Sequence, residues 1–381
     1  MMECVIALTP ALQRSDWGTP EGIPQLLGFT PDGEPYAEAW WGAHPLVPSG
    51  TEEGPLDAVI ARDPVKALGA EVADTFGRLP YLLKVLSIAR PLSIQVHPIA
   101  SVARDGFAAE EVQGIAYDDR ARTFKDASHK PELLVAMTPM EVLVGFRPES
   151  DLRRDLVGLG SACAHVLLEA LDGGGLAAYV TAALDGADLD AVTVLASLPE
   201  SMGGSLGAAR LAAQTYPQDP GVLVALAMNA LSLAPGDATF TPAGVVHCYL
   251  GGMGLEIMAN SDNVVRAGLT SKPINKGLLL KLARLEHTAP AHPEIVTKGA
   301  VRHLQTEADE FSLDLVEDGT AVVSRGPRIV LALGSECEAV TKSERRVVPK
   351  GHGVFVGASS GPVTVSSEGL TAIASVPPRR R

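Results

Sequence analysis

Short runs of apolar residues that end at Gly or Pro characterise the first part of the chain, to about residue 148. Three of these runs lie at residues 82–88, 92–97 and 133–137. Runs of this length between turn residues are typical of β-strands rather than helices. The pattern therefore predicts a β-rich unit over residues 1–149.

The hydrophobic pattern changes at residue 150. Up to about residue 233, apolar residues recur at helical spacing in Ala- and Leu-rich segments, for example SACAHVLLEAL and GVLVALAMNALSL. Gly and Pro separate these segments, and Ser150 is a candidate N-cap for the first of them. We expect four or five helices, which form an inserted α-helical domain over residues 150–233.

Strand-like runs return at residues 237–241 and 245–250, and residues 276–287 read as one more helix. After residue 287, six short apolar runs follow at spacings of about 8–12 residues, with turn residues between them, which is typical of a sandwich or barrel. The sequence thus predicts a mainly β fold in which residues 234–290 complete the first β unit. Residues 291–381 would form a second one.

Composition narrows the possible functions. The 381 residues are 46% hydrophobic and 20% charged, enough apolar material for a sizeable folded core. Lys and Arg number 31 against 45 Asp and Glu, and the net charge of −14 disfavours nucleic acid and anionic membranes as partners. The apolar stretches stop short of ~18 residues, so we expect no membrane span. The start of the chain lacks a secretory signal pattern, and we expect a cytoplasmic protein.

The four cysteines are scattered without a CxxC pair, which argues against a disulfide framework or a zinc ribbon. Oxygen and nitrogen donors offer another kind of metal site. Gln95 and His97 lie two positions apart on a predicted strand, so they share a face. Without further signals, they could equally be a hydrogen-bonded polar face inside a barrel.

A second polar cluster is His129-Lys130-Pro131-Glu132. Pro131 forces Lys130 into an extended conformation, so Lys130 and Glu132 would share one face, with His129 on the other face or at the mouth. Beside a cation, Lys130 would become a candidate for proton transfer. A surface ion pair is the alternative reading of this tetrapeptide.

The segment from Gly236 to His247 spells G-x5-P-x-G-x2-H, with a tight turn at Pro242 and Gly244. It resembles the second half-motif of cupin barrels, in which the histidine binds a metal. Gly251 replaces the Asn that often follows. By the same resemblance, the metal ligands would be Gln95, His97, Glu132 and His247. This set suits Zn²⁺, with Mn²⁺, Fe²⁺ or Co²⁺ also satisfying the donor chemistry.

Residues 251–272 are dense in polar groups and contain few strand formers. Residues 260–263 read as a turn, and Arg266 and Lys272 follow it. The segment is either a solvated surface loop or a pocket wall in which Arg266 binds an anion.

Together these segments resemble the type I mannose-6-phosphate isomerase (phosphomannose isomerase) family. The matching segments are Asp16-Trp17-Gly18, AEAWWGAHP, YLLKVLSIARPLSIQVHP, HKPE, FTPAGVVHCY and LEIMANSDNVVRAGLTSK. The resemblance covers most of residues 10–290 and implies cupin-like jelly-roll barrels with one zinc ion per chain. The implied zinc-binding catalytic domain is residues 1–149 plus 234–290.

The resemblance also assigns roles to individual residues. Arg266 matches the arginine usually assigned to the active site, and His129, Lys130 and Asp262 match positions proposed for ring opening and proton transfer. The implied contacts to substrate or phosphate are Ser93, Lys84 and Lys272, with Glu256 and Tyr249 lining the pocket.

The implied reaction interconverts mannose 6-phosphate and fructose 6-phosphate through an enediol, by moving a proton between C2 and C1. We expect Lys130 to be the base, with Glu256 as the alternative. Asp262 would orient His129 for ring opening, and Arg266 would stabilise the enediolate or hold the phosphate. Lys84 and Lys272 would supply a local positive field. The reaction would serve mannose metabolism, including GDP-mannose biosynthesis, in a monomer or weak homo-oligomer.

Two other functions remain open from the sequence: an iron-dependent cupin oxygenase, and a sugar-binding cupin without catalytic activity. The C-terminal β unit repeats a Pro-x-Gly turn at Pro349 and Gly351, but Val354 stands where a histidine ligand would follow. We therefore predict a second barrel without metal. His352 is an alternative ligand there.

Overall fold

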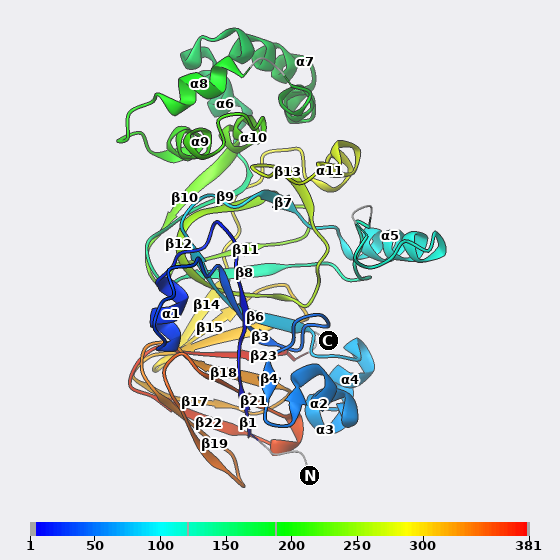
Figure 1. Cartoon of the computed structure of the whole chain (residues 1–381), viewed down its shortest axis with the longest axis vertical. Coiled ribbons are helices and arrows are strands. Elements are labelled where there is room, and N and C mark those ends of the chain that lie inside the picture. Colours follow the sequence, from blue (N-terminus) through cyan, green and yellow to red (C-terminus); the bar gives the residue numbers. More distant parts are fainter. Residues whose placement is uncertain (1–4, 120–121, 187–188, 379–381) are drawn as a thin grey trace.

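The computed structural model describes residues 5–119, 122–186 and 189–378. Figure 1 shows helices α6–α10 gathered at one end, a large sheet in the middle, and two further sheets at the other end. Strands hold 32% of the chain and helices 29%. The fold is therefore mostly β, as the apolar pattern predicts.

The central sheet has ten strands, and its longest strand, β12 (His247–Ala259), joins the others. The first half of β12 pairs with β9 and β7, and the second half pairs with β6 and β8. The other strands of this sheet are β2 (Ala11–Gln13), β3 (Glu38–Gly42), β6 (Tyr81–Ile88), β7 (Ile94–Val96), β8 (Glu132–Ala136), β9 (Met140–Phe146), β10 (Met228–Leu233), β11 (Ala238–Thr241) and β13 (Val265–Gly268).

The opposite end of the molecule contains a seven-stranded and a four-stranded sheet, packed over an apolar core that is rich in valine. The seven strands, in spatial order, are β1 (Val5–Leu8), β21 (Gly353–Val356), β18 (Arg328–Ala332), β23 (Thr371–Ser375), β16 (Ser312–Val316), β15 (Val301–Gln305) and β14 (Glu294–Lys298). The four are β17 (Gly319–Val323), β22 (Val363–Ser367), β19 (Cys337–Val340) and β20 (Arg345–Val348). Strand β1 thus joins a sheet whose other strands come after residue 290. No local pattern announces this pairing.

The helical lobe, which we define as α6–α10, forms its own core together with one face of the central sheet. Its helices are α6 (Glu149–Leu159), α7 (Ala162–Leu184), α8 (Asp190–Ala196), α9 (Gly204–Thr215) and α10 (Gly221–Leu226). The number of helices agrees with the expectation of four or five. Pro148 is the N-cap of α6, so the expected cap at Ser150 is wrong by two residues.

The segment GVLVALAMNALSL is only half helical. Helix α10 ends at Leu226, and residues Met228–Leu233 form β10, antiparallel to β9. Pairing with an available sheet edge overrides the helical propensity of these residues. The expected helix at 276–287 is also shorter, since α11 (Lys276–Leu282) ends five residues earlier.

The first part of the chain contains helices that the apolar pattern did not predict. These are α1 (Gly22–Leu27), α2 (Leu56–Arg62), α3 (Pro64–Leu68), α4 (Ala70–Phe76) and α5 (Ala100–Val112). In the thirteen-residue α5 only Ala103 is fully buried, so there is no apolar stripe at helical spacing to reveal the helix. The remaining elements are the two-stranded sheet of β4 (Gly50–Thr51) and β5 (Gly54–Pro55), and the short 3-10 helix Ala358–Ser360.

Helix α7 is, by length and composition, the one helix within the described ranges that could cross a membrane. At 23 residues, α7 is longer than the limit of ~18 residues that the sequence analysis set for its apolar stretches. However, Gly174 and Gly175 depart from helical geometry, so two shorter helices meet at a kink. Residues on both sides of the kink, including Leu167 and Tyr179, are buried in the core of the helical lobe. One face of α7 therefore packs into the core of the helical lobe.

Candidate metal centre and adjoining cleft

Strand β12 brings three distant segments to one point. Its first residue, His247, pairs with Gln95 on β7 and with Val144 on β9. Farther along, Met258 pairs with Glu132, the first residue of β8. His97 directly follows β7. The predicted donors, spread over more than 150 residues of sequence, therefore meet inside the central sheet.

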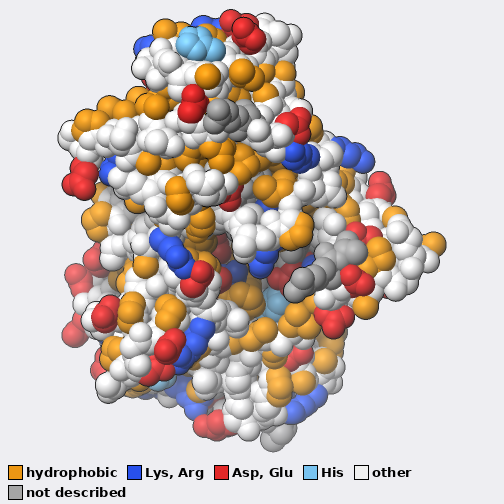
Figure 2. All heavy atoms as spheres, turned by 45° about the horizontal axis from the view of Figure 1, so that its top comes forward, with side chains coloured by type: hydrophobic (Ala, Val, Ile, Leu, Met, Phe, Trp, Pro, Cys, Tyr) orange, Lys and Arg blue, Asp and Glu red, His pale blue; other side chains and the backbone are white. Residues whose placement is uncertain are grey.

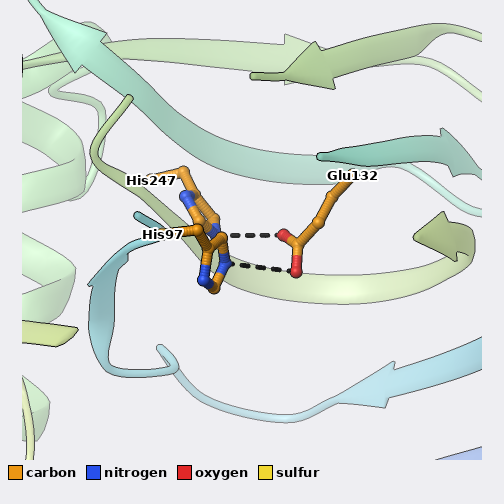
Figure 3. A group of neighbouring side chains, drawn as sticks. All are labelled: His97, Glu132 and His247. Carbon is orange, nitrogen blue, oxygen red and sulfur yellow. Dashed lines mark ion pairs between the residues drawn. The ribbon is translucent and has the colours of Figure 1, made fainter. Parts of the chain in front are cut away.

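His97, Glu132 and His247 point toward one another (Figure 3). His97 Nε2 lies 3.2 Å from Glu132 Oε1, and His247 Nε2 lies 3.1 Å from Glu132 Oε2. All three side chains are buried, and their donor atoms lie within 4.8 Å of one another. Within the described residues, this is the one group of three or more His, Cys, Asp or Glu side chains that could hold a metal ion.

The hydrogen bond at Nδ1 of each histidine ring determines whether Nε2 carries a proton or a lone pair. His97 Nδ1 lies 2.7 Å from the Asn263 carbonyl, and His247 Nδ1 lies 3.2 Å from the Val245 carbonyl. A carbonyl only accepts, so each Nδ1 carries the proton and each Nε2 lone pair faces Glu132. His97 Nε2 is also buried without a hydrogen bond. Lone pairs that converge on a carboxylate fit a shared cation.

The electrostatics of the cluster agree with this geometry. Burial opposes the charge of Glu132, but the neighbouring Lys130 holds the pKa of that carboxyl well below its usual range. Burial outweighs the attraction of Glu132 and lowers the pKa of His97 to about 4. The carboxylate is therefore charged and the His97 imidazole neutral near pH 7, as metal ligands must be.

Gln95, the fourth predicted ligand, is half-buried beside this cluster. Its Nε2 donates to Ser93 Oγ at 3.2 Å. This hydrogen bond uses the amide nitrogen, so the amide oxygen is the atom available to a cation. The ligand role of Gln95 stays a prediction.

A chain of charged groups continues from the cluster. Lys130 Nζ lies 2.9 Å from Glu132 Oε1, on the face that the extended geometry predicts. Lys84 is buried between Glu38, at 3.2 Å, and Glu256, at 3.8 Å. Burial would lower the pKa of Lys84, but these carboxylates raise it. Lys84 therefore stays charged inside the central sheet.

Glu256 accepts a hydrogen bond from the Tyr249 hydroxyl at 2.9 Å. The two residues are seven positions apart, so regular alternation would place them on opposite faces. A register shift between Tyr249 and Gly251 corrects the alternation, and Gly252, at φ +100°, adopts a conformation that favours glycine. Burial, with the charge of Glu132, raises the pKa of Glu256 to about 7.

His129 and Asp262 do not contact each other, so the expected pair is wrong. His129 Nε2 lies 2.7 Å from Glu310 Oε1, in the segment before β16. Asp262 Oδ2 instead lies 3.0 Å from His44 Nε2. Alternation explains the result, because His129 faces away from Lys130 on the extended segment. Neither Glu310 nor His44 carries a local signal that would reveal these contacts.

A cleft of about 840 Å³ adjoins the metal cluster. Figure 2 shows charged side chains within a hollow in the middle of one face of the molecule. The walls of the cleft include four residues that the sequence predicted for the site: Ser93, Gln95, Arg266 and Lys272. Arg266 on β13 pairs with Gln95 on β7, and Gln95 pairs on its other side with His247 on β12. In the described part of the chain, no carboxylate forms an ion pair with Arg266 or Lys272.

These two cations influence each other. Burial lowers the pKa of Arg266, and the charge of Arg266, with burial, lowers the pKa of Lys272. Uncompensated positive charge in a protein of net charge −14 marks a place for an anion. Among the sequence-predicted pocket residues, Lys84, Tyr249 and Glu256 lie at the buried cluster rather than along the walls of this cleft.

The helical lobe supplies one wall, which the sequence did not reveal. Residues 215–220, between α9 and α10, line the cleft. Asp219 accepts hydrogen bonds from the backbone N–H groups of Gly221 and Thr270 and so joins the lobe to the segment that carries Lys272. Gly221 and Gly268 pack so closely that a Cβ on either would collide with the other's backbone. These contacts join segments about 50 residues apart.

The fold and the site define a protein with a buried His–Glu–His group that could hold a metal ion, beside a cleft whose walls include Arg266 and Lys272. Residues 5–149 match the model for "Phosphomannose isomerase type I, catalytic domain". The chain is 34% identical to mannose-6-phosphate isomerase of Escherichia coli over 384 residues, which cover 96% of this chain and 98% of the relative.

Solved structures agree. Mannose 6-phosphate isomerase of Salmonella typhimurium, bound to its substrate fructose 6-phosphate and to zinc, superposes with a TM-score of 0.90 at 32% identity and covers 98% of this chain and 100% of that one. A mannose 6-phosphate isomerase bound with zinc and yttrium gives 0.89 at the same identity and coverage. The chain belongs to the type I phosphomannose isomerase family, which confirms the resemblance.

Proposed function

We propose that this protein is a zinc-dependent aldose–ketose isomerase that interconverts mannose 6-phosphate and fructose 6-phosphate. The observation that carries the proposal is the pair of imidazole Nε2 atoms directed at one buried carboxylate beside a cleft with unpaired cations. Full-length similarity to mannose-6-phosphate isomerases supports it, as does the substrate bound in the Salmonella typhimurium enzyme.

In this proposal Gln95, His97, Glu132 and His247 hold one Zn²⁺. When bound, the ion supplies Lewis acidity that stabilises negative charge on the sugar oxygens. Arg266 and Lys272 bind or stabilise the anionic parts of the sugar phosphate, and Ser93 lies on the same cleft wall. Arg266 pairs with the proposed ligand Gln95 by strand register, so it would also stabilise the negative charge that develops on the enediolate oxygens.

The proton transfer needs one group that removes a proton from C2 or C1 and returns it to the other carbon. Lys130 is our first assignment, since its Nζ reaches Glu132 at the centre. Glu256, with a pKa of about 7 and a hydrogen bond to Tyr249, is the alternative base. Lys84 supports Glu256 by supplying a neighbouring positive charge. The family resemblance assigns ring opening to His129, whose partner would then be Glu310 rather than Asp262.

The architecture is proposed as two cupin-like jelly-roll barrels with an inserted helical domain. Residues 1–149 with 234–290 form the metal-binding domain, 150–233 the insert, and 291–381 the metal-free barrel. Pairing of β10 with β9 and of β1 with β21 ties segments across these bounds. The substrate is a small sugar phosphate, without nucleic acid or membrane partners, in a cytoplasmic monomer or weak homo-oligomer.

Metal analysis combined with a coupled assay tests the function. Protein stripped with a chelator and reloaded with one equivalent of Zn²⁺ should convert mannose 6-phosphate to fructose 6-phosphate. The stripped protein should be inactive, and the reloaded protein should consume no O₂. Activity that is independent of metal, or O₂ uptake without isomerisation, would refute the proposal.

A further inference from the structure

His44 is a buried histidine that the mechanism above does not use. Its residue is 2% exposed, in the segment after β3. His44 Nδ1 accepts a hydrogen bond from the Leu46 backbone N–H at 3.3 Å. An accepting Nδ1 carries no proton, so the ring is neutral and its proton lies on Nε2. That Nε2–H is 3.0 Å from Asp262 Oδ2 and donates to it.

Asp262 is held by a second donor at the same oxygen. The Tyr117 hydroxyl, from the segment after α5, donates to Oδ2 at 2.8 Å. Within the described ranges, no hydrogen bond reaches Asp262 Oδ1, and the side chain is 31% exposed. Two donors therefore fix the carboxylate through one oxygen, and none of the described residues occupies the other oxygen.

The backbone places Asp262 beside the metal cluster. The next residue, Asn263, accepts the Nδ1–H of His97 with its carbonyl, and its side chain binds the backbone of residues 125–128, just before Lys130. Burial would raise the pKa of Asp262, but His44, Tyr117 and Lys130 hold it well below its usual range. Asp262 is thus a charged acceptor next to the centre.

We propose that His44, together with Tyr117, is a positioning residue that fixes Asp262 Oδ2 so that Oδ1 accepts a hydrogen bond from a hydroxyl of the sugar. This inference rests on the proposed isomerase function. Asp262 acts as a fixed acceptor that orients the substrate, and His44 acts only through it.

Two substitutions at His44 distinguish the loss of its hydrogen bond to Asp262 from the loss of the imidazole ring itself. In His44→Gln, the amide nitrogen takes the position of Nε2 and can still donate to Asp262. In His44→Asn, the shorter side chain keeps a partner for the Leu46 N–H but cannot reach Asp262. We expect His44→Gln to retain kcat/KM within about threefold and His44→Asn to lose roughly 10–100-fold, with the same zinc content and melting temperature.

A double-mutant cycle distinguishes positioning from structural support. If His44 acts through Asp262, His44→Asn combined with Asp262→Asn is no slower than Asp262→Asn alone, because effects within one unit do not add. Additive losses in kcat/KM, or equal losses in His44→Gln and His44→Asn, would overturn the inference. An inactive zinc-loaded wild-type protein would instead refute the proposed function.

Should His44→Asn fail to fold, the wild-type protein still tests the inference. In ¹⁵N-labelled protein, the His44 ring should give the chemical shifts of a neutral imidazole with the proton on Nε2 and a slowly exchanging, downfield Nε2–H. The same cycle with Tyr117→Phe then replaces the His44 variant. A His44 proton on Nδ1, or additive losses in the Tyr117 cycle, would contradict the inference.

Discussion

The central sheet and the C-terminal sheets contain the same turn with different consequences. In the central sheet, Pro242-x-Gly244 is followed three residues later by His247. In the C-terminal sheets, Pro349-x-Gly351 is followed at the same distance by Val354. Gly244 and Gly351 both have positive φ, at +83° and +77°. The two turns thus share their backbone conformation, and they differ in the side chain that follows, His247 in one and Val354 in the other.

The interiors differ accordingly. His247 faces Glu132 in a buried cluster with Lys130. Val354 instead packs in an apolar core with Val330 and Ile373. Buried charges are costly unless they are paired, so a folded protein keeps them where they have a function. We infer that the donor side chains define the site, since the turn alone is compatible with a purely structural core.

The largest expected effect comes from giving the first turn the residue of the second. His247→Val removes one ligand and leaves Glu132 without one of its partners. We expect zinc stoichiometry near zero, and isomerase activity reduced by more than about 1,000-fold, as expected when Lewis-acid stabilisation is lost. Metal analysis and the coupled assay measure both. A variant that still bound one zinc tightly would break the contrast between the two turns.

The next effect separates metal binding from proton transfer within the central sheet. Lys130→Ala should abolish exchange of the C2 proton with solvent and slow the reaction by about 100- to 10,000-fold, the range for loss of a general base. Zinc content should stay at one per chain. Glu256→Gln is the matched comparison: if it stops the exchange and Lys130→Ala does not, Glu256 is the base.

The reverse exchange tests the C-terminal core. Val354→His buries an imidazole among valines without a partner, so unfolding free energy should fall by about 1–3 kcal/mol. The variant should gain no zinc and keep its isomerase activity. Urea unfolding and metal analysis provide the test, with Val354→Ala as the control for lost packing. Zinc binding by Val354→His would show that the turn is sufficient to build a site.

The smallest expected effect is a difference between wild type and Glu256→Gln in how the free energy of unfolding depends on pH. In metal-free protein, the pKa of folded Glu256 is about 7, above the ordinary value of 4.5. The folded state therefore binds more protons than the unfolded state between these values, and the contribution of Glu256 to stability, complete below pH 4.5, is lost as the pH rises through 7. Wild type should lose more stability between pH 5 and pH 8 than Glu256→Gln. Equal losses in urea unfolding would contradict this assignment.

The turn motif at His247 and the resemblance to a known family singled out His97, Glu132 and His247, which the structure brings together. Lys130 and Glu132 share a face as expected, and His129 faces away. The sequence missed the partners of His129 and Asp262. Glu310 carries no motif, and His44, although it lies in the matching segment AEAWWGAHP, gives no local sign of the distant residue that it contacts. The sequence also failed to predict strands β1 and β10, because these segments become strands only by pairing with β21 and β9, which are distant in the chain.

The central claim is that one divalent ion lies between His97, Glu132 and His247, with Gln95 completing the set. A crystal structure of the zinc-loaded protein, with data collected at the zinc absorption edge, tests it most directly. We predict one anomalous peak within about 2.0–2.2 Å of both Nε2 atoms and of a Glu132 carboxylate oxygen. A peak elsewhere, or none at these three side chains at full zinc loading, would contradict the account.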